Sequence, residues 1–262
     1  LTHAQGFNGL TDELINELDA KGVPLIEDVC ESHGAMHNEK KAGSFGLISN
    51  FSFFYAHHMS TIEGGMICTN DNKIYQQARM LRSHGMVREA NDATIKENYY
   101  KENPSLHPDF IFAFPAYNVR NTEIGGIMGL SQLKRLDENI ERRTKNLHRF
   151  LDQLNSKIYR TDFKLEGSSN YAFNLILKEP DDLLVLKLMK KMKSSDLEFR
   201  RGSAGGGNQT RQPYLKDIVP NNHYKSFPET EHVHFYGFYI GNFPDLKSEE
   251  IDDICRILNS VE

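Results

Sequence analysis

Hydrophobic residues in the first half of the chain recur in two ways, at helical spacing and in short continuous runs. Leucine and isoleucine recur at helical spacing between Thr11, which can cap a helix, and Gly22, which can end one. A second helix is predicted to open at residues 70–72 and to run to about Ser83. Short apolar runs, each typical of a strand, lie at 23–27, 47–55 and 66–69. A helix followed by a buried strand is the unit of a parallel α/β sheet, so we expect this half to be α/β.

The second half of the chain follows a different pattern. Between Arg120 and Leu154, apolar residues recur at helical spacing and predict a long helical stretch. The stretch 85–117 has neither the periodicity of a helix nor that of a strand, so it predicts a long loop. Long loops in a compact domain are usually functional or mobile. Further strands are predicted near 171–177, 197–201 and 233–240, and further helices near 181–193 and from residue 248 onward. This α+β pattern predicts a change of domain near residue 130, with domains over residues 1–130 and 131–262.

Composition argues against several classes of protein. The 262 residues are 39% hydrophobic and 26% charged with a net charge of -5, which is ordinary for a globular protein and unlike a dedicated nucleic-acid binder. No apolar run approaches the roughly 20 residues that cross a bilayer, and no signal peptide is visible. Cys30, Cys68 and Cys255 are odd in number and far apart, so they indicate neither a disulfide framework nor a metal site. We therefore expect a cytoplasmic protein.

Two apolar runs end in residues that can carry chemistry. LIEDVCESHG at 25–34 places Asp28 at the end of a strand, and FSFFYAHHMSTIEGG at 51–65 leads to two histidines. A carboxylate at the carboxyl edge of an α/β sheet lies where such sheets bind ligands and can pair with a pyridinium nitrogen; it could also cap a helix that follows. By itself, the pair His57 and His58 is more typical of a surface feature than of a metal site, because neighbouring strand residues point to opposite faces.

Together these two segments resemble the cofactor-binding core of the sugar aminotransferases that use pyridoxal phosphate, the DegT/DnrJ/EryC1/StrS family. Counted back from the Glu-Gly-Gly at 63–65, the lysine that holds the cofactor in most members coincides with His57. Histidine cannot form that link, so the resemblance narrows to a histidine-containing branch. These are 3-dehydratases of nucleotide-linked 4-keto-6-deoxy sugars such as GDP-4-keto-6-deoxy-D-mannose. The resemblance implies an α/β aspartate-aminotransferase-like fold (fold type I), with part of a large α/β domain followed by a small α+β domain.

The resemblance also implies roles for individual residues at the cofactor, pyridoxal or pyridoxamine 5'-phosphate. His57 would be the catalytic acid and base, and Asp28 would hold the pyridinium nitrogen protonated. Glu31 would lie beside the phenolic oxygen, although it could equally be a solvated helix residue. Ser52 would contact the phosphate, and Asn118, in the segment YNVRNTE, would reach the phosphate of the other subunit. The implied assembly is a homodimer with shared active sites.

Substrate contacts are implied for His84 and Arg88, which lie one turn apart and could share a helix face or a loop mouth. For Arg88 alone, a positively charged helix C-terminus is an equal alternative. The glycine-rich stretch at 202–207 lacks a phosphate-loop ending and is read either as a flexible loop or as a substrate-facing loop. In the second case an arginine would lie near anionic groups: Arg200, Arg201 or Arg211.

The implied function is a nucleotide-sugar 3-dehydratase that converts a 4-keto-6-deoxyhexose nucleotide to a 3-deoxy sugar, with glutamate as amino donor. Such enzymes serve deoxysugar and lipopolysaccharide O-antigen biosynthesis and need no metal, nucleic acid or membrane. The alternatives are a sugar aminotransferase of the same family and a truncated, non-catalytic dimerisation or binding module. Members carry, before the position of Leu1, a glycine–hydroxyl turn for the phosphate and an aromatic residue that stacks on the ring. We therefore expect this chain to be the C-terminal two-thirds of such an enzyme.

Overall fold

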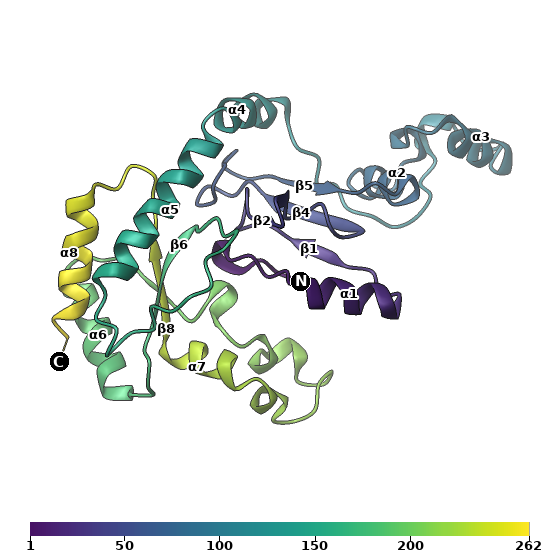
Figure 1. The fold of residues 1–262 in the computed structure, drawn as a ribbon. Coiled ribbons are helices and arrows are strands. Elements are labelled where there is room, and N and C mark those ends of the chain that lie inside the picture. The colour runs from purple at the N-terminus through teal and green to yellow at the C-terminus, as the bar shows by residue number, and fades with distance from the viewer. Residues whose placement is uncertain (262) are drawn as a thin grey trace. The chain divides into compact units, whose positions relative to one another are not determined.

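The computed structural model describes residues 1–261, in which the chain forms two compact units (Figure 1). The first unit comprises 1–2, 10–30 and 43–134, and the second comprises 3–9, 31–42 and the chain from residue 135 onward. Each unit thus combines one long part of the chain with two short segments from the N-terminal region, an interleaving that the sequence pattern did not indicate. The assignment of 1–130 and 131–262 to a large cofactor-binding domain and a small domain stays a prediction.

A three-stranded sheet organises the first unit. Its order is β1-β4-β5, with β1 at Ile26–Asp28, β4 at Ile48–Ser52 and β5 at Gly65–Cys68. Strands β1 and β4 run parallel, and β4 and β5 run antiparallel. The three predicted strands are therefore confirmed, but the strand expected over 47–55 ends at Ser52. His57 and His58 consequently lie in the turn beyond β4, and the expectation that strand geometry separates their side chains is wrong.

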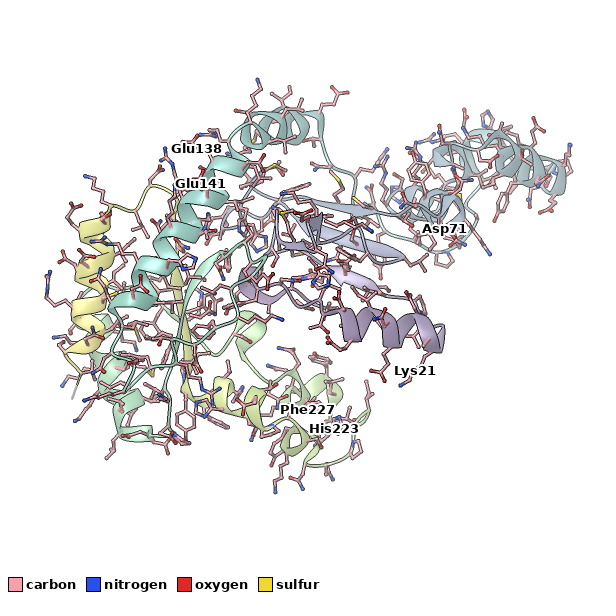
Figure 2. All side chains as sticks on the ribbon, in the orientation of Figure 1. Lys21, Asp71, Glu138, Glu141, His223 and Phe227 are labelled. Carbon is pink, nitrogen blue, oxygen red and sulfur yellow. The ribbon has the colours of Figure 1, made fainter. Side chains whose placement is uncertain are left out.

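The predicted helices of the first unit form where capping residues mark them. Helix α1, Asp12–Lys21, begins where the Thr11 hydroxyl accepts from the backbone N–H of Leu14 at 3.1 Å. It ends at Gly22, whose φ of 63° favours glycine. Helix α2, Asn72–Leu81, begins where the Asp71 carboxylate accepts from a backbone N–H. Figure 2 labels Lys21 in the last turn of α1 and Asp71 before α2. Both helix predictions are confirmed.

One helix of the first unit contradicts the sequence prediction. Helix α3, Ala93–Glu102, lies inside the segment that was expected to be a long loop, and it begins where Asp92 accepts from the backbone N–H of Thr94. None of its residues is buried, so it has no apolar stripe that hydrophobic periodicity could detect. Helix α4, Glu123–Leu133, follows the cap residue Thr122.

The second unit is built on an antiparallel sheet of order β6-β8-β7, with β6 at Ala172–Ile176, β8 at Gly237–Gly241 and β7 at Arg200–Arg201. Its helices are α5 at Leu136–Gln153, α6 at Asp182–Ser194, α7 at Pro228–Tyr236 and α8 at Ser248–Asn259, and β2 (Met36–His37) and β3 (Lys40–Lys41) form a short hairpin. The strand expected near 233–240 is wrong in its first half, which is helical to Tyr236. The helical stretch expected over 120–154 is two helices, α4 and α5.

The core of the second unit lies between its sheet and helices α5, α6 and α8. The rings of Phe150 and Phe173 stack with centroids 4.4 Å apart, and the buried Tyr159 hydroxyl donates to the carbonyl of Leu258 at 2.7 Å. Short 3-10 turns complete the fold: Ala4–Gly6, Val87–Glu89, Pro108–Phe110, Ala204–Gly206, Gln209–Arg211, Pro213–Leu215 and His223–Ser226. Within residues 1–261, no helix combines the length and the apolar character needed to cross a membrane.

Candidate functional site

Asp28 is fixed at the end of β1. Its Oδ1 accepts from Asn50 Nδ2 at 3.0 Å and from the backbone N–H of Cys30 at 3.1 Å. Asn50 is also its register partner on the parallel strand β4. The residues that follow Asp28 form turns, so the alternative of a helix cap is wrong. The carboxylate is therefore held at the carboxyl edge of a parallel strand pair, the edge where α/β sheets bind ligands.

The neighbouring acid, Glu27, has a structural role that the sequence pattern did not reveal. It is fully buried, and its carboxylate accepts from the backbone N–H groups of Gly43, Phe45 and Gly46, each at 2.7 Å. Adjacent strand residues point to opposite faces, so Glu27 and Asp28 cannot share a site. The sequence does contain one sign of this role, because Glu27 is an acid inside an apolar run and a glycine-containing loop follows it. Glu27 fixes the loop that leads into β4.

The carboxyl end of β4 lies at the same edge as Asp28, because the two strands are parallel. Ser52 ends β4 opposite Gly65 of β5, and its hydroxyl accepts from the backbone N–H of Phe54 at 3.3 Å. The turn that follows is closed at Phe53, whose N–H donates to the Gly64 carbonyl and whose carbonyl accepts from Thr61, both at 2.9 Å. The contact of Ser52 with a cofactor phosphate stays a prediction.

The two histidines of this turn lie in different environments. The backbone N–H of His57 donates to the carbonyl of Phe54 at 3.0 Å, and the two rings meet edge to face with centroids 5.5 Å apart. The His57 side chain is half-buried, whereas His58 is only 4% exposed. His58 thus belongs to the packing of the unit, unlike the surface feature that the pair suggested, and His57 is the imidazole that a ligand could contact.

Two distant segments bring His84 and Asn118 together. Ser83 forms a β-bridge with Asn118, and the backbone N–H of His84 donates to the carbonyl of Tyr117 at 2.6 Å. His84 has a φ of 60°, in the left-handed region, which turns the chain away after α2. Both residues are site candidates from the sequence, but no pattern in the sequence places them side by side.

Arg88 contradicts one of the two expected placements, the shared helix face, and leaves the loop mouth open. It lies in the 3-10 turn Val87–Glu89, well past the end of α2 at Leu81, so it shares no helix face with His84 and does not end that helix. Its guanidinium lies over the ring of Phe110 at 5.6 Å, and its Nε is 3.7 Å from the Glu89 carboxylate. A substrate contact of Arg88 stays a prediction.

Glu31 belongs to the second unit. Its Oε2 accepts from the backbone N–H of Gln5 at 2.8 Å, and the surrounding residues form turns, so the alternative of a solvated helix glutamate is wrong. Its predicted place beside a cofactor's phenolic oxygen stays a prediction.

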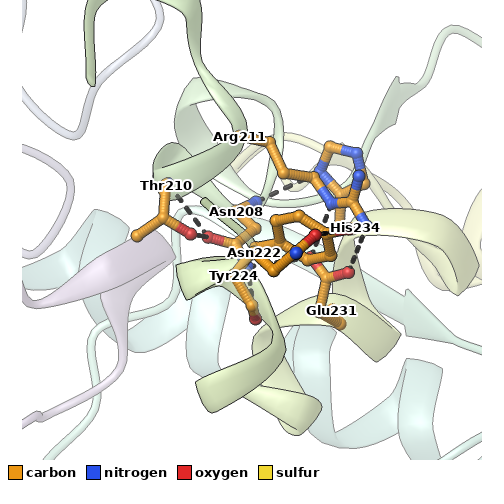
Figure 3. Close-up of polar contacts among 7 residues, drawn as sticks. All are labelled: Asn208, Thr210, Arg211, Asn222, Tyr224, Glu231 and His234. Carbon is orange, nitrogen blue, oxygen red and sulfur yellow. Dashed lines mark hydrogen bonds and ion pairs between the residues drawn. The ribbon is translucent and has the colours of Figure 1, made fainter. Parts of the chain in front are cut away.

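The glycine-rich stretch at 202–207 opens no regular helix, and the arginine that follows it is already engaged. Arg211 donates from Nε to Glu231 at 2.8 Å, and its guanidinium lies 3.9 Å from the centre of the Tyr224 ring. Asn208 donates to the same carboxylate at 2.8 Å, as Figure 3 shows. Arg211 therefore links this loop to α7, and a contact of Arg200, Arg201 or Arg211 with an anionic ligand stays a prediction.

The donor set of the first unit fits a pyridinium cofactor. It offers a fixed carboxylate for a protonated ring nitrogen, a serine hydroxyl and an asparagine amide for a phosphate, and an imidazole. No lysine occurs between Lys41 and Lys73, so none follows β4 where the imidazole lies. Among residues 1–261, no group of three or more histidine, cysteine or acidic residues could hold a metal ion.

Two known proteins with related sequences share one name. GDP-4-keto-6-deoxy-D-mannose 3-dehydratase from Escherichia coli O55:H7 is 33% identical over 250 residues, which is 94% of this chain and 63% of that protein. The protein of the same name from Yersinia pseudotuberculosis is 32% identical over 251 residues, 94% of this chain and 62% of its own length. The chain therefore spans less than two thirds of the length of these relatives.

The comparison with solved structures leads to the same group. The structure of the E. coli GDP-4-keto-6-deoxy-D-mannose-3-dehydratase with bound hydrated PLP matches with a TM-score of 0.84 and 31% identity, over 98% of this chain and 66% of that one. This match confirms the predicted α/β aminotransferase-like fold of type I. The sequence model of the DegT/DnrJ/EryC1/StrS aminotransferase family matches residues 3–259. The chain is thus a member of the DegT/DnrJ/EryC1/StrS aminotransferase family.

Proposed function

We propose that the protein is a nucleotide-sugar 3-dehydratase that uses pyridoxamine phosphate. Its substrate is a nucleotide-linked 4-keto-6-deoxyhexose, GDP-linked by analogy with the named relatives, and its product is a 3-deoxy sugar. The observation that carries the proposal is the imidazole of His57 in the turn after β4, beside a strand edge that carries Asp28 and lacks a lysine. The identity of 33% to a named dehydratase supports the same activity.

Four residues would hold the cofactor. Asp28 would accept a hydrogen bond from the protonated ring nitrogen, with its orientation set by Asn50. Ser52 would donate to the phosphate, Asn118 would reach the phosphate of a partner subunit in a homodimer, and Glu31 would lie beside the phenolic oxygen. When bound, the cofactor supplies an electron sink for the carbon that loses a proton.

His57 would move that proton. An imidazole gains and loses a proton near neutral pH, so it can take a proton from cofactor carbon C4′ and return it later in the cycle. A lysine at this position could also move the proton, but its amine would hold the cofactor covalently and favour transamination. His57 would move the proton without forming a covalent link to the cofactor, which would favour loss of the sugar's 3-hydroxyl and release of the nitrogen as ammonia. Glutamate would serve as the amino donor.

The test is a product assay with pyridoxamine phosphate, glutamate and GDP-4-keto-6-deoxy-D-mannose. We expect a 3-deoxy sugar and ammonia in equal amounts, a rate lowered at least about 100-fold by His57→Asn, and no change in His148→Gln, an exposed histidine on α5. An amino sugar formed without ammonia would instead identify a sugar aminotransferase. Absence of both products together with absence of cofactor binding would identify a non-catalytic module.

A further inference from the structure

Two backbone hydrogen bonds of Phe53 close the turn that follows β4. The Phe53 carbonyl accepts from the N–H of Thr61, and the Phe53 N–H donates to the carbonyl of Gly64, both at 2.9 Å. Because Thr61 and Gly64 both pair with the same residue, Ile62 and Glu63 between them are left out of the pairing. Extra residues on one side of an antiparallel pair form a β-bulge, a feature that is frequent beside active sites. The term bulge is used below for Ile62 and Glu63.

Ile62 has an unfavourable backbone conformation within this bulge. Its φ is 72°, in the left-handed region, where a β-branched side chain crowds the backbone. The side chain is 64% exposed, so burial of the isoleucine does not stabilise this conformation. The Ser60 hydroxyl accepts from the N–H of Ile62 at 3.0 Å, but this contact is exposed. Strained residues persist where the surrounding structure fixes the chain, so other contacts must hold the bulge.

Thr61 supplies contacts that span the bulge. Its hydroxyl donates to the carbonyl of Glu63 at 2.8 Å, in addition to the backbone hydrogen bond with Phe53. The side chain is buried, and its methyl carbon would lie 3.5 Å from a Cβ added to Gly129 of α4. A Cβ added to Gly64 would lie 2.7 Å from the hydroxyl oxygen. Thr61 therefore touches both ends of the bulge and the helix that packs beside it.

The loop between Phe53 and Thr61 carries His57. Near the start of this loop, the backbone N–H of His57 donates to the carbonyl of Phe54 at 3.0 Å, and the two rings are in contact. At the end of the loop, Thr61 fixes the chain to Phe53. A group that transfers a proton must stay within hydrogen-bond reach of its target, and a displacement of about 1 Å can lower a rate about 100-fold. The position of the imidazole therefore depends on both ends of the loop.

We propose that Thr61 is a positioning residue for His57. Its hydroxyl holds the bulge in place although Ile62 resists the left-handed conformation, and the closed bulge keeps the His57 loop in the geometry that proton transfer needs. The catalytic part of this proposal rests on the proposed function, whereas the link between the hydroxyl and the loop belongs to the fold. Glycine adopts the left-handed conformation without strain, so a glycine at position 62 would make the hydroxyl dispensable.

Single-turnover dehydration by protein loaded with pyridoxamine phosphate tests the catalytic part. We expect Thr61→Val to slow this turnover at least about tenfold, to change the affinity for pyridoxamine phosphate less than about twofold, and to be rescued by Thr61→Ser. Thr69→Val is the matched control, because the Thr69 hydroxyl also donates to a backbone carbonyl at 2.8 Å, that of Leu47, beyond the opposite end of β5. Equal rates in Thr61→Val and Thr69→Val, or a loss of cofactor affinity as large as the loss of rate, would overturn the proposal.

The variant Ile62→Gly tests the role of strain. It should raise the midpoint of thermal unfolding by about 2–4 °C, because glycine takes the left-handed conformation freely. Adding Ile62→Gly to Thr61→Val should return the turnover rate toward that of Ile62→Gly alone, since the bulge then forms without the hydroxyl. A double variant as slow as Thr61→Val would overturn the coupling between the hydroxyl and the bulge.

Proton NMR of the His57 imidazole in the cofactor-free protein separates this proposal from the proposed function, and His57→Asn identifies the resonance. We expect one sharp resonance in the native protein and in Thr69→Val. In Thr61→Val the resonance should broaden or split, because the loop then occupies more than one conformation. If the native protein fails to dehydrate the sugar but the resonance responds in this way, the proposed function falls and the control of the loop by Thr61 stands. If the resonance is the same in Thr61→Val as in Thr69→Val, that control falls.

Discussion

The two three-stranded sheets within residues 1–261 display their polar residues in different ways. In the first unit, Asp28 and Ser52 end neighbouring parallel strands, and each belongs to a short local motif. In the second unit, Asn174, Tyr239 and Arg200 come from three strands that are distant in sequence and become neighbours only when the antiparallel sheet forms. Residues at strand ends can therefore be recognised from sequence, whereas a row across a sheet is created by pairing.

The largest expected effect concerns the strand-end carboxylate. Asp28→Asn should lower turnover by at least about 100-fold, the scale of losing one preorganised electrostatic partner. Stability should hardly change, because the asparagine side-chain oxygen can still accept from Asn50 and Cys30. Steady-state rates and thermal melting measure both quantities. Asp71→Asn is the matched control, since asparagine also caps α2 well. Native turnover in Asp28→Asn would remove the carboxylate from the site.

Glu27, next to Asp28, should show the opposite behaviour, with a loss of stability and little loss of turnover. Glu27→Gln places an amide among three backbone N–H donors, and the free energy of unfolding should fall by about 2–4 kcal/mol. Turnover per folded molecule should stay near that of the native protein. Urea denaturation followed by circular dichroism measures the loss. A stable but inactive Glu27→Gln protein would mean that the two faces of β1 do not divide structural and chemical roles.

A smaller effect is expected at the loop that joins β7 to α7. Arg211→Lys loses the paired contacts with Glu231 and the stacking on Tyr224, and should cost about 1 kcal/mol of unfolding free energy. Arg256→Lys, in an exposed pair with Asp253, should cost close to nothing. Chemical denaturation of both variants under the same conditions provides the comparison, and equal losses would show that the loop is not fastened by this cluster.

The smallest effect is a pH dependence of stability. Hydrogen bonds from Arg149 and Gln153 lower the pKa of the Asp252 carboxyl to about 2, against 3.8 ordinarily. A depressed folded-state pKa adds stability that is present above the ordinary pKa and is lost as pH falls toward 2. Stability of the native protein should therefore fall more between pH 4 and pH 2 than that of Asp252→Asn, as thermal melting would show. If the stabilities of the native protein and of Asp252→Asn fell in parallel with pH, the contacts of Arg149 and Gln153 on α5 with Asp252 on α8 would make no such contribution.

Most of the regular structure was predictable where capping and periodicity agree. Helices α1, α2 and α6 begin at Thr11, Asp71 and Asp181, each of which accepts a backbone hydrogen bond as its residue type suggests. Helices α3 and α7 were missed because neither buries a residue, so neither has an apolar stripe. The end of α7 is also rich in aromatic and β-branched residues, which are typical of a strand, but the extended conformation begins only at Gly237.

The candidate site was predictable only in part, for the same physical reason. Asp28, Ser52 and His57 lie in motifs that a local resemblance identifies, and the parallel pairing of β1 and β4 brings two of them to one edge. The proximity of His84 and Asn118 depends on a bridge between separate segments. The role of Glu27 depends on a loop that turns back onto its carboxylate. Contacts of this kind have no signature within a single stretch of sequence.

Product analysis of His57→Lys tests the central claim most directly. The claim is that an imidazole after β4 moves a proton without holding the cofactor, and that this difference directs the sugar toward loss of its 3-hydroxyl. With GDP-4-keto-6-deoxy-D-mannose and glutamate, the native protein should release ammonia and a 3-deoxy sugar. The His57→Lys variant should form an amino sugar or be inactive, while His148→Gln matches the native protein. Dehydration by His57→Lys at the native rate would show that His57 is not the catalytic base.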